Sequence, residues 1–107
     1  MRYRIVLIVV AKSDLREIFR YVELNDSSER ADNLVDGIEK AITSLTLMPE
    51  RGHYPPELER IGIREFREIH FKPYRIVYSI QDNDIVVHCV LDGRRDMQTL
   101  LQQRLLR

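Results

Sequence analysis

An apolar stripe at helical spacing runs through residues 31–45 and decides much of what the fold can be. Every third or fourth side chain there is apolar, in the set Ala31, Leu34, Val35, Ile38, Ile42 and Leu45. That spacing is typical of a helix with one face against a core. Pro49 disfavours helical geometry in the residue before it, so the helix must end by Met48.

A second amphipathic pattern lies upstream and is formed by Leu15, Ile18, Phe19 and Val22. Ser13 or Asp14 is expected to cap the helix that carries it. The polar run at residues 25–28 predicts a turn, and Ser27 or Ser28 is placed to cap the next helix. Two amphipathic helices joined by a short turn form an antiparallel hairpin, and its apolar faces need a layer to cover.

Strand patterns lie on both sides of the hairpin. Residues 2–10 predict a strand, and because its apolar run shows no alternation we expect it in the interior of the sheet. The prolines and the glycine of residues 49–56 predict a loop. Beyond this loop, apolar patterns predict strands at 63–71, 74–80 and 85–91. The last of these is apolar at nearly every position and is expected to lie centrally, beside the first strand.

Turn and cap signals complete the order of elements. Asp82-Asn83 predicts a two-residue turn, and Asp96 is placed to cap a terminal helix with the stripe Met97, Leu100, Leu101 and Leu105. The expected fold is α+β in the order β-α-α-β-β-β-α, with a two-helix hairpin packed on a mainly antiparallel four-stranded sheet. Residues 1–107 are expected to form a single domain, because this length suits one core but not two.

Composition and charge exclude several classes of protein. With 44% hydrophobic and 32% charged residues, the chain does not have the composition of a disordered protein. Its net charge of zero gives no global attraction to nucleic acid or membrane. The zero hides an asymmetry, since residues 1–59 carry 8 basic and 11 acidic side chains whereas residues 60–107 carry 9 and 6. A surface that faces anions is therefore expected in the second half.

The single cysteine and the apolar start of the chain have simple interpretations. Cys89 excludes an intramolecular disulfide and a cysteine-rich zinc site, and its apolar neighbours predict a buried, inert thiol. No metal or cofactor is expected. The run from Ile5 to Ala11 superficially looks like a signal peptide, but it is short and no small-residue cleavage site follows it. It is also too short to span a bilayer, so we expect a cytoplasmic protein that makes no membrane contact.

Three motifs follow one another along the chain: Leu-x-x-x-Pro-x-x-Gly at 45–52, Tyr-Arg-Ile-Val-Tyr at 74–78 and Leu-Asp-Gly-Arg-Arg-Asp at 91–96. Together with the strand and the helical hairpin, they resemble the ParE/RelE toxin superfamily, and the Gly-Arg-Arg-Asp stretch favours its ParE-like branch. The resemblance implies the toxin of a type II toxin–antitoxin pair, neutralised by a cognate antitoxin that is ParD-like or similar. ParE-like members block DNA gyrase, whereas RelE-like members cut messenger RNA on the ribosome.

The ribonuclease alternative places specific demands on side chains. Cleavage of RNA through its 2′-hydroxyl needs a base, an acid and positive charge around the phosphate. The resemblance to RelE-like ribonucleases implies basic side chains at alternate positions on the strand before Tyr-Arg-Ile-Val-Tyr, a later arginine and a terminal acid. The matching positions are Glu68, His70, Arg75 and Arg95 (or Arg94), with Leu100 and Leu101 where the acid is expected.

A carboxylate beside a phosphate is repulsive, by about 1 kcal/mol or more at close range. Because Glu68 stands where a basic group is needed and leucines stand where the acid is needed, we expect a toxin that inhibits growth by binding gyrase without catalysis. A ribosome-dependent endoribonuclease is the alternative, and Glu68 with His70 would be its acid–base pair. A degenerate or purely regulatory partner protein is a third reading.

Basic side chains on or beside the last three strands supply the expected target-binding surface. Arginine suits carboxylates and phosphates, because its planar fork binds them bidentately and stays charged. The candidates are Arg75, Arg94, Arg95, Arg67 and Lys72, with Arg64 close by. For each of them the alternative is ordinary pairing with a neighbouring carboxylate, such as Asp92 or Asp96 for the two later arginines and Glu65 or Glu68 for Arg67.

Arg75 differs from the other arginines because it lies in the middle of a strand, where a charge needs a buried partner or a functional reason. His70 is expected to be an exposed strand residue and His88 a half-buried one. The candidate surfaces for an antitoxin are the helical hairpin, the edge strand 63–71 and the terminal helix. The assemblies to consider are a homodimer and a toxin–antitoxin hetero-oligomer.

Overall fold

A four-stranded sheet with the strand order β1-β4-β3-β2 lies at the centre of the structure, a computed structural model that describes residues 2–106. The strands are β1 (Arg4–Leu7), β2 (Arg67–Phe71), β3 (Tyr74–Gln81) and β4 (Asp84–Asp92). β1 runs parallel to β4, whereas β4 with β3 and β3 with β2 are antiparallel. The expected α+β class and the central place of the last strand are confirmed.

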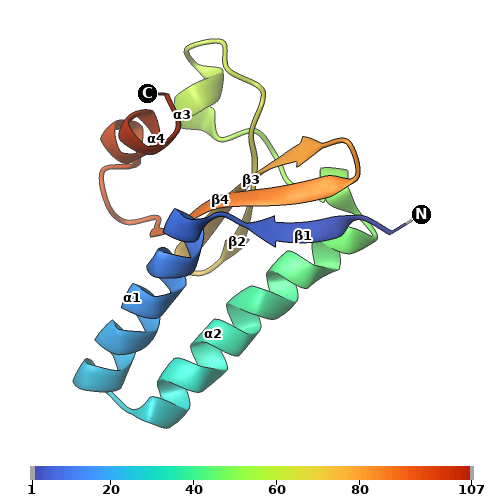
Figure 1. Ribbon diagram of the computed structural model, residues 1–107. Helices are drawn as coiled ribbons and strands as arrows, with labels where there is room; N and C mark the ends of the chain where they lie inside the picture. The colour runs from blue at the N-terminus through green and yellow to red at the C-terminus, as the bar shows by residue number, and fades with distance from the viewer. Residues whose placement is uncertain (1, 107) are drawn as a thin grey trace.

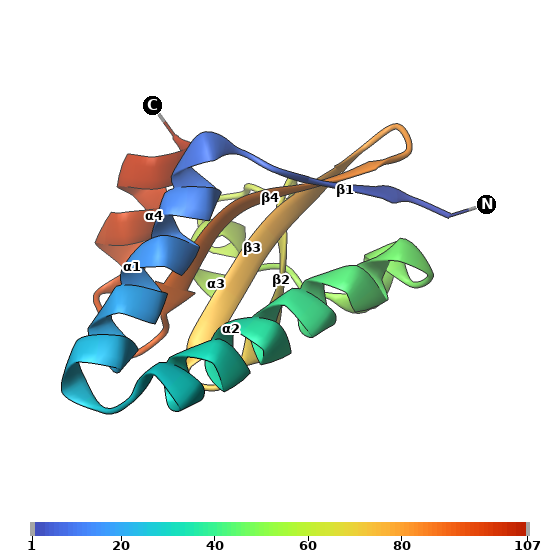
Figure 2. The ribbon, with the colours of Figure 1, turned by 60° about the horizontal axis from the view of Figure 1, so that its bottom comes forward.

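Two helices, α1 (Val9–Asn25) and α2 (Ser28–Thr43), form the expected hairpin over one face of the sheet (Figures 1 and 2). The Ser27 hydroxyl caps α2 by accepting from the amide of Arg30 at 3.1 Å. After a 3-10 turn, η1 (Ser44–Thr46), the chain leaves the helical path before Pro49, as predicted. The apolar stripes of both helices meet the sheet in one core, which includes Leu15, Ile38, Ile42, Leu45, Ile69, Ile76, Tyr78, Ile85, Val87 and Val90.

The opposite face of the sheet is covered only in part, by shorter elements. These are the helices α3 (Pro56–Glu59) and α4 (Met97–Leu105). A second 3-10 turn, η2 (Pro49–Arg51), lies against η1 after the end of α2. Figure 1 shows α3 and α4 side by side on the side of the sheet away from the hairpin. They enclose a second, smaller apolar cluster of Leu58, Val77, Cys89, Leu91, Met97 and Leu101. The stretch predicted as a loop at 49–56 thus contains one short helical turn and ends where α3 begins.

The first strand is shorter than predicted and lies in a different place. We expected an interior strand over 2–10, but β1 ends at Leu7 and forms one edge of the sheet. The rest of the apolar run belongs to α1, where Val9 is 75% exposed. A short run of β-branched residues does not itself distinguish a strand from the first turn of a helix, and here the parallel pairing with β4 stops at Leu7.

The start of α1 also differs from the prediction. Ile8 is the N-cap residue and its side chain makes no capping bond, so neither Ser13 nor Asp14 caps the helix. Asp14 is instead a buried residue inside α1. Its Oδ2 atom accepts hydrogen bonds from the amide of Val90 (3.0 Å) and from Arg104 Nη2 (2.8 Å). This carboxylate therefore ties α1 to β4 and α4.

The remaining predictions concern the second half of the chain. The strand expected at 63–71 begins only at Arg67, because residues before it turn their apolar side chains into the second cluster. The other two strands agree with the prediction to within a residue or two at each end, and Asp82 in the turn between them has a positive φ of 56°. Asp96 caps α4 through the amide of Thr99, as expected.

The cysteine and the helices can be compared with the sequence analysis in two further respects. Cys89 is fully buried, and burial raises the pKa of its thiol to about 12, which agrees with an inert group. Within residues 2–106, each helix is too short or too polar to pass through a lipid bilayer.

Candidate functional site

Two of the three motifs meet at the hydroxyl group of Tyr78. This hydroxyl donates to the carbonyl oxygen of Pro49 (2.6 Å) and accepts from the amide of Gly52 (3.1 Å), and burial raises its pKa. A Cβ atom at residue 52 would lie 2.6 Å from that hydroxyl oxygen, so only glycine fits. Leu45 is fully buried in the core at the start of the same motif. The motif at 45–52 therefore fixes the chain that follows α2 onto β3.

The strand arginine, Arg75, lies between two carboxylates on the face opposite the hairpin. Its Nε and Nη2 atoms donate to Glu68 at 2.6 and 3.0 Å, and its Nη1 and Nη2 atoms donate to Glu57 at 2.8 and 2.6 Å. The Glu68 side chain is 1% exposed, and those of Arg75 and Glu57 are each 13% exposed. Hydrogen bonds to the two carboxylates raise the pKa of Arg75, and the guanidinium lowers the pKa of Glu57. Arg75 thus has the buried partner that its position in the strand requires.

Two histidines flank the Glu68 carboxylate on its solvent side. His53 Nε2 lies 2.8 Å from Glu68 Oε2, and His70 Nε2 lies 3.6 Å from the same oxygen. The two rings meet edge to face, with their centroids 5.1 Å apart. We call the five residues His53, Glu57, Glu68, His70 and Arg75 the ionic cluster. Three of its members, Glu68, His70 and Arg75, are the strand residues that the sequence analysis matched to those expected of a RelE-like ribonuclease.

The ionic cluster lacks two of the groups that RNA cleavage needs. Arg75 already directs its guanidinium to two carboxylates, so it is not free to neutralise a phosphate. At the positions of the terminal acid, Leu101 is fully buried and Leu100 packs against the second apolar cluster. The cluster does retain histidine next to carboxylate, a combination that is suited to proton transfer or to metal binding.

Three other candidate residues lie together at one end of the sheet. We call Lys72, Arg94 and Arg95 the basic rim, and all three are exposed. The amide of Gly93 donates to the Pro73 carbonyl oxygen at 2.8 Å and so joins the β2–β3 turn to the segment after β4. Lys72 and Arg94 both line a shallow depression of about 250 Å³ at this junction. The structure thus brings together side chains that are more than twenty positions apart in the sequence.

One member of the basic rim is paired. Arg94 Nη2 lies 2.6 Å from Asp92 Oδ2, and this contact lowers the pKa of the aspartate. The Arg94 side chain is still 75% exposed, so the pair is open to solvent and contributes little stability. The amide of Arg95 donates to the Asp92 carbonyl oxygen at 3.1 Å, and the Arg95 side chain is exposed.

The remaining arginine candidates have local partners. Arg67 does not pair with Glu65 or Glu68, but donates to the Gly52 carbonyl oxygen at 2.9 Å and lies 4.7 Å from the ring centroid of Tyr54. It therefore holds the segment before α3 against β2. Arg64 forms an exposed ion pair with Glu59 at 3.3 Å.

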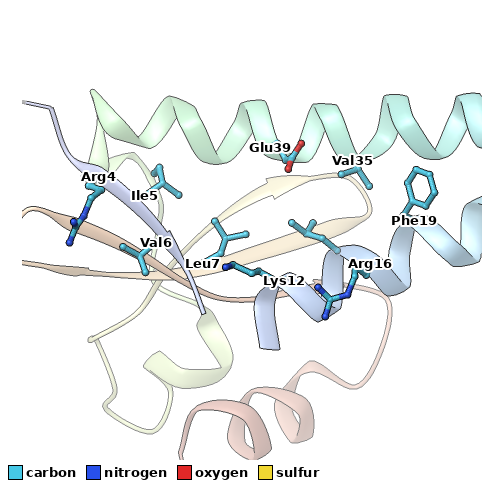
Figure 3. A pocket seen from close by; sticks show the side chains of 10 residues that line it. Arg4, Ile5, Val6, Leu7, Lys12, Arg16, Phe19, Val35 and Glu39 are labelled. Atoms are coloured by element: carbon cyan, nitrogen blue, oxygen red, sulfur yellow. The ribbon is translucent and has the colours of Figure 1, made fainter. Parts of the chain in front are cut away.

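A groove of about 900 Å³ separates the edge strand β1 from the helical hairpin. Its floor is apolar, with side chains from β1, α1 and α2 that include Leu7, Phe19 and Val35 (Figure 3). Basic side chains line it as well, and these are Arg4, Lys12 and Arg16. Since β1 is at the end of the sheet, one side of this strand has no strand neighbour within residues 2–106. The other edge strand, β2, is bridged at Glu68 by backbone bonds to His53.

Sequence reasoning missed three members of the buried charge pairs and one histidine. Glu57 and His53 come from the segment around α3 and reach β2 and β3 only after folding, and Asp14 meets Arg104 across most of the chain. No local spacing signals such contacts. The one usable hint was Arg75 itself, since a charge in the middle of a strand requires an acidic partner somewhere.

Comparisons with known proteins agree with the fold. The family model described as the ParE toxin of the type II toxin–antitoxin system parDE matches residues 5–97. Toxin ParE3 of Caulobacter vibrioides is 28% identical over 101 residues, covering 94% of this chain and 97% of the relative. A chain of the chromosomal ParDE system from P. aeruginosa has a TM-score of 0.70 at 15% identity, over 83% of this chain and 94% of that one.

A second solved structure widens the comparison to the superfamily. A double arginine mutant of E. coli toxin RelE in the free state has a TM-score of 0.69 at 15% identity, over 100% of this chain and 98% of that one. The family model over residues 5–97 and the ParE3 relative, with which the fold agrees, place the chain in the ParE/RelE toxin superfamily. Within it, the chain belongs to the ParE toxin family of type II toxin–antitoxin systems. Membership of this family implies an antitoxin partner.

Proposed function

We propose that this toxin acts in the cytoplasm and arrests growth by binding DNA gyrase without catalysis, and that a cognate antitoxin neutralises it. The observation that carries the proposal is the state of Arg75. Its guanidinium donates to both Glu57 and Glu68, so the centre of a RelE-like active site is filled by an internal ion-pair network.

The charge of this network opposes binding of an RNA phosphate. Two carboxylates against one guanidinium leave an excess of one negative charge on the face where a nuclease would bind its substrate. Repulsion of a phosphate at close range costs about 1 kcal/mol or more at a protein surface. A leucine in the place of the acid removes the means of protonating the leaving oxygen.

The basic rim is the surface that we assign to the target. Lys72, Arg94 and Arg95 are exposed, and they project from two turns that are bonded together at Gly93. Rigid presentation of exposed arginine forks suits recognition of carboxylates or phosphates on a macromolecule. In this proposal Arg75 and Arg67 act as structural supports, because their donors are already used inside the toxin.

The groove beside β1 is the surface that we assign to the antitoxin. Its apolar floor suits one face of an amphipathic helix, and the open edge of β1 suits an added strand. Arg4 is paired with Asp84 and Glu39 lines the same groove, so Lys12 and Arg16 are the basic side chains that would favour an acidic segment. Occupation of this groove would give a toxin–antitoxin hetero-oligomer, which size-exclusion chromatography of the co-expressed pair would separate from a toxin homodimer.

Charge reversal on the basic rim tests the target assignment. We expect Arg94→Glu with Arg95→Glu to abolish growth arrest and inhibition of supercoiling by purified gyrase, while antitoxin binding is kept. The matched control is Arg2→Glu with Arg20→Glu, two exposed arginines outside the rim, which should arrest growth as the parent does. If the rim variant still inhibits gyrase as strongly as the parent, the assignment is wrong.

The endoribonuclease remains the second candidate, because the RelE structure matches the full length of the chain and because His53 and His70 flank Glu68. Primer extension on cellular messages after induction separates the two candidates. Transcript cleavage that is lost on His70→Ala would support the nuclease and overturn the gyrase proposal. Absence of both cleavage and gyrase inhibition would instead support a regulatory role.

A further inference from the structure

Three side chains of the ionic cluster bring potential metal-ligand atoms close together. His53, Glu68 and His70 each offer one potential ligand atom, and these atoms all lie within 4.8 Å of one another. The two histidine nitrogens approach one and the same oxygen, Glu68 Oε2, at 2.8 and 3.6 Å. Two imidazoles and one carboxylate form a ligand set that is common at zinc sites with an open fourth position.

The backbone holds these three residues in place. His53 and Glu68 are paired by two backbone bonds, from His53 N to Glu68 O at 3.1 Å and from Glu68 N to His53 O at 2.7 Å. His70 is two residues further along β2, so its side chain lies on the same face of the strand as that of Glu68. The ligand atoms therefore come from two extended segments that are bonded to each other, which reduces the cost of assembling a site.

Arg75 provides the outer support that metal ligands usually have. Its Nε atom donates to Glu68 Oε1 at 2.6 Å and its Nη2 atom donates to Oε2 at 3.0 Å, so the two bonds fix the plane of the carboxylate whose Oε2 atom also faces the two histidines. Orientation of a ligand by a second hydrogen-bonding group is the usual arrangement around protein-bound zinc. Since Arg75 is matched by two carboxylates, the cluster has no net positive charge that would repel a cation when both histidines are neutral.

We propose that His53, Glu68 and His70 bind one divalent cation of the zinc class, with the fourth coordination position open to water. Ligand bonds of about 2.0–2.1 Å in tetrahedral geometry place ligand atoms roughly 3.3 Å apart, which is close to the observed spacings. The His53 and His70 side chains are 57% and 45% exposed, so solvent reaches the site. The site adjoins the basic rim, because His70 lines the same depression as Lys72 and Arg94. None of its three ligands is a rim residue, so the proposal does not depend on the gyrase target.

A matched control exists within the chain. His88, the only other histidine, lies on β4, with its Nε2 atom 2.8 Å from the Ser79 hydroxyl and its ring against Phe66. Burial lowers the pKa of this histidine, and it is not part of the ligand group. A variant at this position changes the number of histidines without touching the proposed site.

The test is titration of the untagged, metal-free toxin with Zn²⁺ in competition with a chromogenic chelator. We expect one equivalent to bind. Loss of a hydrogen-bonding partner of a metal ligand weakens metal binding by roughly tenfold or more. Loss of a ligand itself, in His53→Ala or His70→Ala, should weaken Zn²⁺ binding by more than that. His88→Ala should bind as the parent does. Because His53 and His70 are exposed, their variants are expected to keep the circular-dichroism spectrum of the parent.

Cobalt gives an independent measurement of the same site. Co²⁺ added to the parent should give the visible absorption of a four-coordinate ion, and the band should be lost in the doubly substituted toxin, His53→Ala with His70→Ala. The proposal is overturned if the parent and this double variant bind Zn²⁺ equally, or if His88→Ala weakens binding as much as His53→Ala does. Gyrase inhibition, measured on the same samples, tests the proposed function separately.

Discussion

The hairpin face of the sheet is closed by helices of 17 and 16 residues, whereas the opposite face is closed by two short helices and a cluster of charges. The hairpin face buries a continuous apolar core, in which the hydroxyl of Tyr78 is bonded to the backbone. On the other face, Val77 and Cys89 pack under α3 and α4. Arg75 is two residues before Val77 on β3, and Glu68 is the partner of Val77 on the neighbouring strand β2.

This difference separates two sources of stability. The free energy gained by burying apolar side chains does not depend on pH. On the hairpin face this burial stabilises the fold, which the chain shares with RelE at 15% identity. An ion-pair network depends on protonation and on the presence of every partner. The face that carries the ionic cluster is therefore the face whose stability responds to solution conditions.

The largest expected effect comes from removal of the cation at the centre of the charged face. Arg75→Met leaves Glu57 and Glu68 without their counter-charge, and breaking a buried pair in this way costs about 3–5 kcal/mol. Urea unfolding at pH 7 would measure the loss.

The double variant Arg75→Met with Glu68→Gln provides the control. It removes the cation and the more buried carboxylate together, so it should be more stable than Arg75→Met alone. A single variant as stable as the parent would show that the network contributes nothing to the fold.

A comparable but pH-independent loss is expected on the hairpin face. Leu45→Ala empties a fully buried position in the apolar core, and such truncations cost about 2–5 kcal/mol. The loss, measured by urea unfolding, should be the same at pH 7 and at pH 4, because Leu45 carries no charge and its removal breaks no ion pair. A strong pH dependence of the Leu45→Ala effect would contradict the contrast between the two faces.

The smallest effect concerns the titration of Glu57. The guanidinium of Arg75 lowers the pKa of Glu57 in the folded state, so the unfolded chain binds the proton more readily. The stability that this carboxylate contributes is therefore fully present above its unfolded pKa of about 4.3, and is lost as the pH falls through the lower folded value. In urea unfolding from pH 7 to pH 3, the free energy of unfolding of Glu57→Gln should fall less steeply at acid pH than that of the parent. An equally steep fall in both proteins would mean that other carboxylates cause it.

Most of the fold could be predicted from patterns that act over short distances. The stripe at 31–45 and the alternation at 74–80 correspond to α2 and β3, because each reflects burial of one face of one element. The same reasoning failed at residues 8–10. A run of β-branched residues is compatible with both states there, and the choice depends on where β4 offers a partner for β1.

The candidate site was harder to predict because its contacts join distant segments. Arg75 could be singled out as a buried charge, but Glu57 is 18 positions away and lies in a helix of four residues that has no periodic pattern. No pattern in the sequence pointed to His53, because its position beside Glu68 depends on one isolated β-bridge between these two residues. The sequence alone did not indicate that Arg75 is paired inside the protein. Because it is, charge reversal of Arg75 would test the ion-pair network and not the recognition of a target.

The bond between Asp14 and Arg104 has a consequence for how the toxin is made. It joins residues 90 positions apart, and the same Asp14 oxygen also holds the Val90 amide of β4. The first helix of the nascent chain therefore remains without these two partners until residues 90 and 104 have left the ribosome. The second apolar cluster waits for the same segment, because Met97 and Leu101 belong to it, so the hairpin face of the sheet can be covered earlier in synthesis than the opposite face.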